Sequence, residues 1–211
     1  MYPNFLWLFS SRTDFIKTRK RLGIKDDVFV IAKLARLSDL KGHDFLLDAA
    51  ASVKKHNPEF KILLIGDGNL KKRFIAKSKQ KGINENIIFT GLVNPKEVPY
   101  YLQCADVLAH VSLHEGLPRA VVQAFALQIP VVCFNVDGAK DIVRHNQNGF
   151  LIPPKDTRHL AQALIKLFDS PDTAKQMGIN GYNQVKEIFG SSTMVLSIDF
   201  VYKEALKKCG K

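Results

Sequence analysis

The 211-residue sequence has few cysteines, no long apolar run and a shortage of acidic residues. Its three scattered cysteines, Cys104, Cys133 and Cys209, are too few for a disulfide scaffold or a cysteine-rich zinc site. No stretch approaches the ~18 apolar residues that would indicate a membrane-spanning helix. The apolar first ten residues lack both a preceding basic residue and a small-residue cleavage site, which argues against a signal peptide. We therefore expect buried thiols and a cytoplasmic location.

Lysine and arginine outnumber the acidic residues by 31 to 20, so the net charge is +11. Such a surface favours anionic partners, which include nucleotides, phosphates, nucleic acid and an anionic membrane face. Charge alone fits a solvated basic surface equally well. The basic run 71–73 is accordingly either a solvated face or a peripheral contact with the inner face of a membrane. The length allows about one and a half domains of ~150 residues, and ordinary composition excludes disordered and collagen-like chains.

Short apolar runs alternate with helical patterns along most of the sequence. The run VFVIAKLA (28–35) is typical of a strand buried on both faces, and only Lys33 interrupts it. This alternation predicts an α/β fold, a Rossmann-like parallel sheet with helices on both faces. Strands are expected at 28–35, 60–65, 86–90, 106–111, 130–134 and 149–152, and helices at 14–22, 43–56, 70–81, 95–103, 117–127, 137–144, 156–168 and within 172–208.

The loops after the first two strands carry cations and glycines at the sheet edge where open parallel sheets bind ligands. Arg36 and Lys41 lie five residues apart in the first loop, RLSDLKG, and the two cations either match a pyrophosphate or belong to a solvated basic loop. The second loop begins with Gly66 and Gly68, a partial G-x-G-x-x-G in which Lys71 replaces the third glycine. This match is too weak for a dinucleotide fingerprint, but its glycines allow the backbone to approach a ligand.

The loop after the fourth strand places an acid, Glu115, ahead of an apolar helix. The backbone N–H groups of Gly116 and Leu117 are expected to open that helix, and a helix N-terminus favours anions. Glu115 either accepts hydrogen bonds from sugar hydroxyls or is an acid favoured by the helix dipole. The glycine of the next loop, 135–139, also opens a helix. We expect His110 and His114 to be unligated, because they lie on a strand and on the loop after it, and no H-E-x-x-H motif is present.

Seven short motifs occur in a characteristic order: RLSDLKG (36–42), GDG (66–68), FTG (89–91), EGLP (115–118), PVV (130–132), DGA (137–139) and NGFLIPP (148–154). Together they resemble the C-terminal, nucleotide-sugar-binding half of retaining GT-B glycosyltransferases of glycosyltransferase family 4. The resemblance covers roughly residues 28–168. That family has two Rossmann-like domains facing across a cleft, and its C-terminal domain holds the sugar donor.

The resemblance implies roles for individual residues of this sequence. Arg36 and Lys41 would neutralise the donor diphosphate and the charge growing on the leaving group, so that no metal is needed. Glu115 matches the first acid of the family's E-x7-E pattern and would contact hydroxyls of the donor sugar. The donor-binding backbone would come from Gly66, Gly68, Gly116 and Leu117, with the segment Gly91, Leu92 and Val93 beside the base.

One position departs from the family pattern. The second glutamate of E-x7-E, thought to bind the ribose hydroxyls, is replaced by Gln123. Eight residues are close to two helical turns, so Gln123 is expected on the same side as Glu115. Glutamine keeps the hydrogen-bonding capacity but loses the charge, which predicts weaker or altered donor binding. The alternative is a partly exposed helix residue without a ligand role.

The resemblance also implies an acceptor-binding domain of ~150–200 residues ahead of Val28, where this sequence has only 27 residues. We therefore expect residues 1–27 to be a remnant of the interdomain connector. Residues 28–190 would form the donor domain, and residues 191–211 a helix that crosses to the acceptor domain. On this interpretation the chain is one half of a longer enzyme and inactive alone.

The expected function is thus the donor half of a retaining, metal-independent hexosyltransferase that uses a UDP- or GDP-linked sugar and no further cofactor. Two alternatives stay open. One is a nucleotide-sugar epimerase, since some epimerases share the GT-B layout. The other is a basic nucleic-acid-binding Rossmann module, which the charge favours although no nucleic-acid motif is present, so we expect no nucleic-acid partner. The base, the sugar and the acceptor are left open by the sequence.

Overall fold

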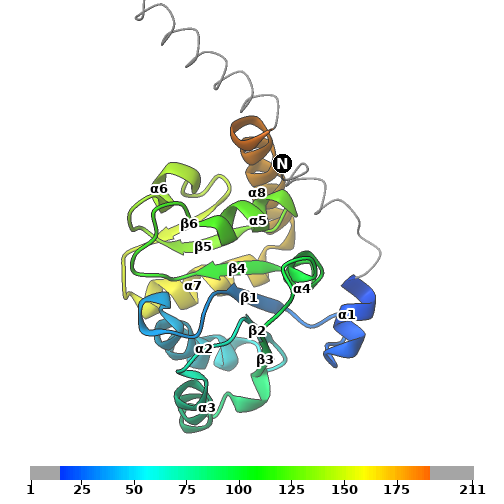
Figure 1. Cartoon of the computed structure of the whole chain (residues 1–211), viewed down its shortest axis with the longest axis vertical. Helices are drawn as coiled ribbons and strands as arrows, with labels where there is room; N and C mark the ends of the chain where they lie inside the picture. The colour runs from blue at the N-terminus through cyan, green and yellow to red at the C-terminus, as the bar shows by residue number, and fades with distance from the viewer. Residues whose placement is uncertain (1–14, 191–211) are drawn as a thin grey trace, which may run out of the picture.

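A six-stranded sheet in the order β3-β2-β1-β4-β5-β6 forms the centre of the molecule, and every neighbouring pair is parallel (Figure 1). The computed structural model describes residues 15–190. The strands are β1 (Val30–Leu34), β2 (Lys61–Ile65), β3 (Ile87–Gly91), β4 (Val107–His110), β5 (Val131–Phe134) and β6 (Gly149–Ile152). The strand order reverses between β1 and β4. In open α/β sheets this switch point is where the loops diverge and a ligand crevice forms.

Helices cover both faces of the sheet, as the alternating pattern predicts. They are α1 (Phe15–Arg21), α2 (His43–His56), α3 (Lys71–Gln80), α4 (Val98–Leu102), α5 (Arg119–Ala126), α6 (Ala139–Ile142), α7 (Thr157–Asp169) and α8 (Pro171–Phe189). On one face, α2, α3 and α7 contribute Leu46, Phe74 and Leu164 to a core shared with the sheet. On the other, α4, α5 and α6 contribute Leu102, Val121 and Ile142 to a second core.

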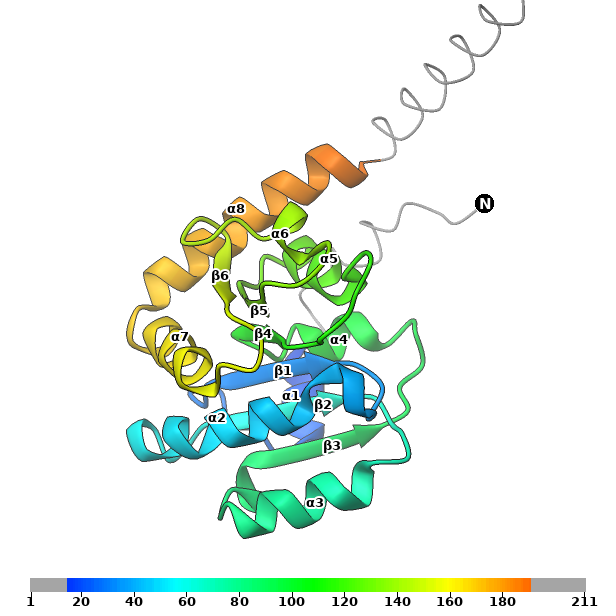
Figure 2. The ribbon, with the colours of Figure 1, turned by 90° about the vertical axis from the view of Figure 1, so that its left-hand side faces the viewer.

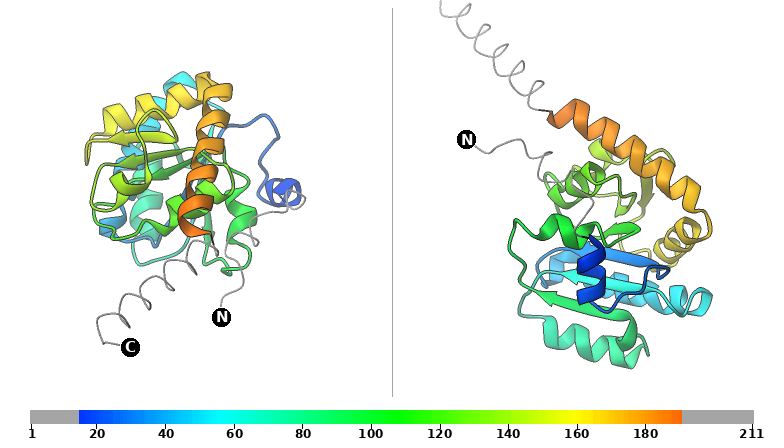
Figure 3. Two further views of the ribbon diagram at one scale, coloured as in Figure 1. Left: turned by 90° about the horizontal axis from the view of Figure 1, so that it is seen from above. Right: turned by 90° about the vertical axis from the view of Figure 1, so that its right-hand side faces the viewer.

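The longest helix, α8, links the two faces at the β6 edge of the sheet (Figure 2). Its Met177 packs into the core on the α2 and α7 side, whereas Val185 packs into the core on the α5 side. Figure 3 shows α8 running from α7 across α5, and these are its main helical contacts. The short helix α1 packs on α4, where the guanidinium of Arg21 lies 5.2 Å from the centre of the Tyr101 ring. Both faces of the sheet are therefore buried, which explains its continuous apolar strands.

Within residues 15–190 the expected strands and helices are present, and the differences lie at their ends. Helix α5 begins at Arg119 rather than at Leu117, because Leu117 precedes Pro118 and a proline disfavours the helical conformation of the residue before it. Helix α6 begins at Ala139 rather than at residue 137, because Asp137 has a left-handed φ of 40°. Helix α4 begins at Val98, so the prediction that Pro95 occupies its first turn is wrong.

The turn that precedes α4 explains that last difference. The backbone N–H of Glu97 bonds the carbonyl oxygen of Asn94, and the Asn94 side chain accepts a hydrogen bond from Lys96 N–H. Pro95 therefore belongs to a separate turn. Cys104 and Cys133 are buried free thiols, as expected, whereas Cys209 and the predicted helix at 191–211 lie outside the described residues. No helix within 15–190 has the length and apolar character needed to span a bilayer.

Candidate functional site

The loops after β1, β2, β4 and β5 meet at the carboxyl ends of the strands. The N–H of Leu37 in the β1 loop bonds the carbonyl oxygen of Asp67 in the β2 loop at 3.0 Å. On the other side, the N–H of Leu113 in the β4 loop bonds the carbonyl oxygen of Leu40 at 2.9 Å. The β1 loop, which contains Arg36 and Lys41, is thus held between its neighbours at the switch point of the sheet.

The two glycines after β2 are required by the packing of the β1 loop. A Cβ on Gly66, whose φ is 137°, would lie 2.3 Å from the carbonyl oxygen of Ala35. A Cβ on Gly68 would lie 2.4 Å from the carbonyl oxygen of Leu37. These glycines therefore allow the β2 loop to approach the protein's own backbone, which fixes the position of Arg36 relative to β2.

Lys41 and Glu115, which are 74 residues apart in the sequence, form a half-buried ion pair with 2.5 Å between Nζ and Oε1. Burial alone would raise the pKa of Glu115. The hydrogen bond and the positive charge of Lys41 outweigh it, so the pKa of this carboxyl lies below its usual value. The structure thereby brings together two of the predicted site residues and keeps Glu115 ionised at neutral pH.

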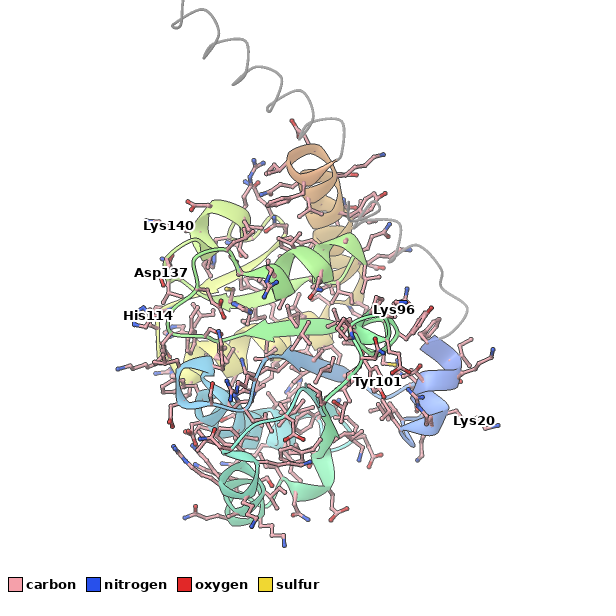
Figure 4. All side chains as sticks on the ribbon, in the orientation of Figure 1. Lys20, Lys96, Tyr101, His114, Asp137 and Lys140 are labelled. Atoms are coloured by element: carbon pink, nitrogen blue, oxygen red, sulfur yellow. The ribbon has the colours of Figure 1, made fainter. Side chains whose placement is uncertain are left out.

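Asp137, in the loop after β5, holds the backbone of Glu115. Its Oδ2 accepts a hydrogen bond from Glu115 N–H at 3.0 Å and lies 3.5 Å from Nδ1 of His114. The N–H of Gly138 bonds the carbonyl oxygen of Glu115 at 3.4 Å. Figure 4 shows His114 and Asp137 together at the carboxyl end of β4, away from Lys20 and Tyr101 on α1 and α4. Asp137 was assigned no role from the sequence, although its place in the loop after a buried strand was a usable signal.

A cavity of about 370 Å³ opens where the β1, β2 and β3 loops meet. Its size is within the range of small-molecule sites. Its walls are mostly apolar, and they include the predicted residues Arg36, Gly66, Leu92 and Val93 together with Asp67 and Val98. Arg36 is exposed at this cavity, and Leu92 is 89% exposed. The residues expected beside a base are therefore next to one of the two expected phosphate-binding cations.

Behind the Lys41–Glu115 pair lies a group of buried polar side chains, Lys33, His43 and His110. Lys33 Nζ, both ring nitrogens of His43 and Nε2 of His110 make no hydrogen bond with any described residue. Burial lowers the pKa of Lys33 to about 7, and burial together with Lys33 lowers the pKa values of His43 and His110 to about 2 and about 3. Sequence reasoning missed this group, although Lys33 interrupts a strand buried on both faces.

The two histidines that the sequence predicts to be unligated have separate environments. His110 is buried, with Nε2 4.0 Å from Glu115 Oε1, and His114 is exposed beside Asp137. Within 15–190, no three His, Cys, Asp or Glu side chains are grouped as metal ligands would be. A cavity of about 710 Å³ lies at the opposite edge, near Val28, Asp106 and Pro130. It contains none of the predicted site residues, so the candidate site is placed at the carboxyl edge.

The remaining predicted residues lie beside this site. Gly116 and Leu117 are exposed in the loop between Glu115 and α5, and Gln123 is half-buried in α5. The expectation that Gly116 and Leu117 open the helix is wrong, because α5 begins only at Arg119. For the same reason, the argument that two helical turns connect Glu115 to Gln123 is wrong, since half of that segment is loop.

Comparisons with known proteins relate this fold to one family. The family model described as Glycosyl transferases group 1 matches residues 14–184. The UDP-Gal:alpha-D-GlcNAc-diphosphoundecaprenol alpha-1,3-galactosyltransferase of Escherichia coli is 27% identical over 179 residues, which cover 80% of this chain and 46% of that protein. The crystal structure of HepE from Anabaena in complex with UDP superposes with a TM-score of 0.87 at 26% identity, over 94% of this chain and 55% of that one.

A structure of a single domain shows the same fold. The C-terminal domain of a glycosyl transferase group 1 family protein from Francisella tularensis superposes with a TM-score of 0.79 at 23% identity. The match covers 87% of this chain and 97% of that domain. By contrast, this chain spans half or less of the length of the curated relatives that it matches.

Proposed function

The chain belongs to the glycosyl transferases group 1 family, and from this premise we propose that it is the donor-binding half of a retaining hexosyltransferase. The proposal specifies a GT-B enzyme of glycosyltransferase family 4 that transfers a hexosyl group from UDP- or GDP-linked sugar to an acceptor hydroxyl. The observation that carries it is the Lys41–Glu115 pair at the switch point, next to the cavity that Arg36 lines. The complexes of HepE with UDP and with UDP-glucose support a nucleotide-sugar donor.

We assign the base to the apolar cavity beside Leu92 and Val93. The diphosphate then lies between Arg36 and Lys41, because a guanidinium and an ammonium together match its charge. Glu115 accepts hydrogen bonds from hydroxyls of the sugar, and the exposed residues Gly116 and Leu117 contribute backbone N–H groups on the same loop. Fixed cations at the leaving diphosphate stabilise the charge that develops in the transition state, so the scheme needs neither metal nor cofactor.

We infer that the acceptor site and complete activity belong to a second Rossmann-like domain, and that this half alone transfers no sugar. A cytoplasmic location at the inner face of an anionic membrane fits the net charge of +11, and the name of the E. coli relative includes a lipid diphosphate. Within the basic run 71–73, however, Arg73 pairs with Asp39 and Asp44. The membrane contact therefore depends on basic residues other than Arg73.

Calorimetric titration with UDP, GDP, UDP-glucose and GDP-mannose tests the donor assignment. We expect one nucleotide class to bind, and R36A and K41A each to weaken binding at least tenfold. The matched control is K55A, because Lys55 is an exposed lysine at the far end of α2 from Lys41. A folded protein that binds none of the four ligands would contradict the proposal. Salt-dependent binding of RNA or DNA without nucleotide preference would instead favour the nucleic-acid module.

A further inference from the structure

Lys33 is a buried amine in the middle of the sheet that the proposed reaction does not use. It lies on β1, between β2 and β4, and is 1% exposed. Its Nζ makes no hydrogen bond with any described residue. A buried, unpartnered amine is costly, and an apolar side chain would fit a strand of this kind better. Packing alone therefore does not explain why a lysine occupies this position.

The titratable groups whose charges interact with Lys33 lie on α2, β4, β5 and the loops after β1 and β4. They are His43 of α2, Lys41 of the short turn before it, His110 of β4, Glu115 of the β4 loop and Cys133 of β5. His43 and His110 are neutral at pH 7, since burial lowers their pKa values to about 2 and about 3. Burial raises the pKa of Cys133 to about 12, so this thiol is neutral as well. Glu115 is ionised.

In the free protein the charge of Glu115 is compensated by Lys41 at 2.5 Å. The proposed donor places a diphosphate on Lys41, and the ammonium then divides its hydrogen bonds between the phosphates and Glu115 or leaves Glu115. A partly buried carboxylate that loses its counter-ion is destabilised. The arriving phosphate charges add to the negative potential around the buried amine, and negative charge nearby favours a protonated lysine.

We propose that Lys33 is a positioning residue for Glu115: when a nucleoside diphosphate engages Lys41, Lys33 takes up a proton from solvent and becomes a counter-cation for Glu115. Donor binding is thereby coupled to the uptake of up to one proton. The inference rests on the proposed function, because it requires a diphosphate at Lys41. It adds to that function a third cation, which acts through Glu115 and does not touch the ligand.

The sign of the coupling follows from linkage. Burial lowers the pKa of Lys33 in the free protein to about 7, and the bound phosphates raise it. Binding is then strongest below pH 7 and weakens as the pH rises, by up to tenfold per pH unit until the pKa of the complex is passed. The useful window is pH 7 to 9, since a terminal phosphate has its own second pKa of about 6.

The test is calorimetric titration of the chain with UDP and with GDP at pH 7, 8 and 9, in buffers of different ionisation enthalpy. The dependence of the heat on the buffer gives the number of protons taken up by the wild-type protein without any substitution. K33M removes the amine while keeping an unbranched side chain of similar length. K55M, at an exposed site on α2, removes the same charge far from the candidate site.

We expect the wild-type protein and K55M to take up a proton at pH 8 and their affinity to fall several-fold from pH 7 to pH 9. K33M should show no uptake and a flat affinity over this window. Binding without proton uptake in the wild-type protein overturns the inference alone. Uptake that persists in K33M and disappears in H110Q assigns the proton to His110 and also overturns it. If neither nucleotide binds, the proposed function fails, and the inference fails with it.

Discussion

The carboxylate of Asp137 accepts a hydrogen bond from the backbone N–H of Glu115 at 3.0 Å, so one side chain ties the β5 loop to the β4 loop. Asp137 itself has a φ of 40°, in the left-handed region that aspartate and asparagine tolerate better than most residues. The orientation of Glu115 thus depends on two properties of residue 137, its acceptor atom and its tolerance of a positive φ.

Substitutions at Asp137 separate these two properties. D137N keeps an acceptor and tolerates the same φ, so we expect little change in the free energy of unfolding. D137G relieves the backbone but loses the acceptor, at a cost of about 1 kcal/mol. D137A loses the acceptor and keeps the unfavourable φ, which adds roughly 1 kcal/mol. We therefore expect the free energy of unfolding, measured by urea denaturation, to decrease in the order D137N, D137G, D137A. Equal stability of D137A and D137N would contradict this order.

Gly42, at the start of α2, offers a test of loop packing with a control built into the chain. A Cβ at Gly42 would lie 1.8 Å from the carbonyl oxygen of Val111, at a φ of 70°. Gly82 has nearly the same φ, 65°, but nothing lies within 4 Å of a Cβ placed there. We expect G82A to lower the free energy of unfolding by about 1 kcal/mol.

G42A should lower it by at least ~2 kcal/mol more, because the β1 and β4 loops must separate to admit the methyl group. The same separation displaces Lys41, so nucleotide affinity should fall in G42A and stay unchanged in G82A. Urea denaturation and calorimetry measure the two effects. Equal destabilisation in the two variants would show that only the backbone conformation matters at Gly42.

The resemblance drawn from the sequence implies a glutamate of the E-x7-E pattern at the position of Gln123. If its side chain reaches the ribose, Q123E restores a charged acceptor, which makes stronger hydrogen bonds than a neutral amide. We expect a several-fold tighter dissociation constant for the nucleotide in Q123E and a several-fold weaker one in Q123A, measured by calorimetry. Q128E, on the exposed residue after α5, is the control for added charge. Unchanged affinity in both Gln123 variants would remove the ribose role.

Much of the fold could be predicted from the sequence because every strand except β3 is almost wholly buried, and the longer helices each bury one apolar face. The α5 start at Arg119 was missed because Pro118 constrains Leu117, a local effect that an apolar pattern does not show. Arg36 and Lys41 are predicted as site residues from their cation spacing, and Glu115 from its position after a strand. The Asp137 hydrogen bond was not predictable, because it depends on how two separate loops pack in space.

The pH dependence of stability provides a test of Lys33 without any ligand. Burial lowers the pKa of Lys33 from 10.5 to about 7 in the folded protein, so between pH 7 and pH 9 the unfolded chain binds more protons at this residue. The free energy of unfolding should therefore rise with pH in this window, by at most about 1.4 kcal/mol per unit. Above pH 9 the raised pKa values of Cys104 and Cys133 oppose this trend, because unfolding then releases thiol protons.

The comparison with K33M isolates the contribution of the lysine. K33M removes the buried amine, so its stability should lack the rise between pH 7 and pH 9, and it should exceed the wild-type stability most at pH 6 to 7. K55M should follow the wild-type curve, since Lys55 is exposed. Urea denaturation at half-unit pH steps gives the three curves. A wild-type curve parallel to that of K33M would mean that Lys33 has the same protonation in the folded and unfolded states, and that its burial does not shift its charge toward neutrality.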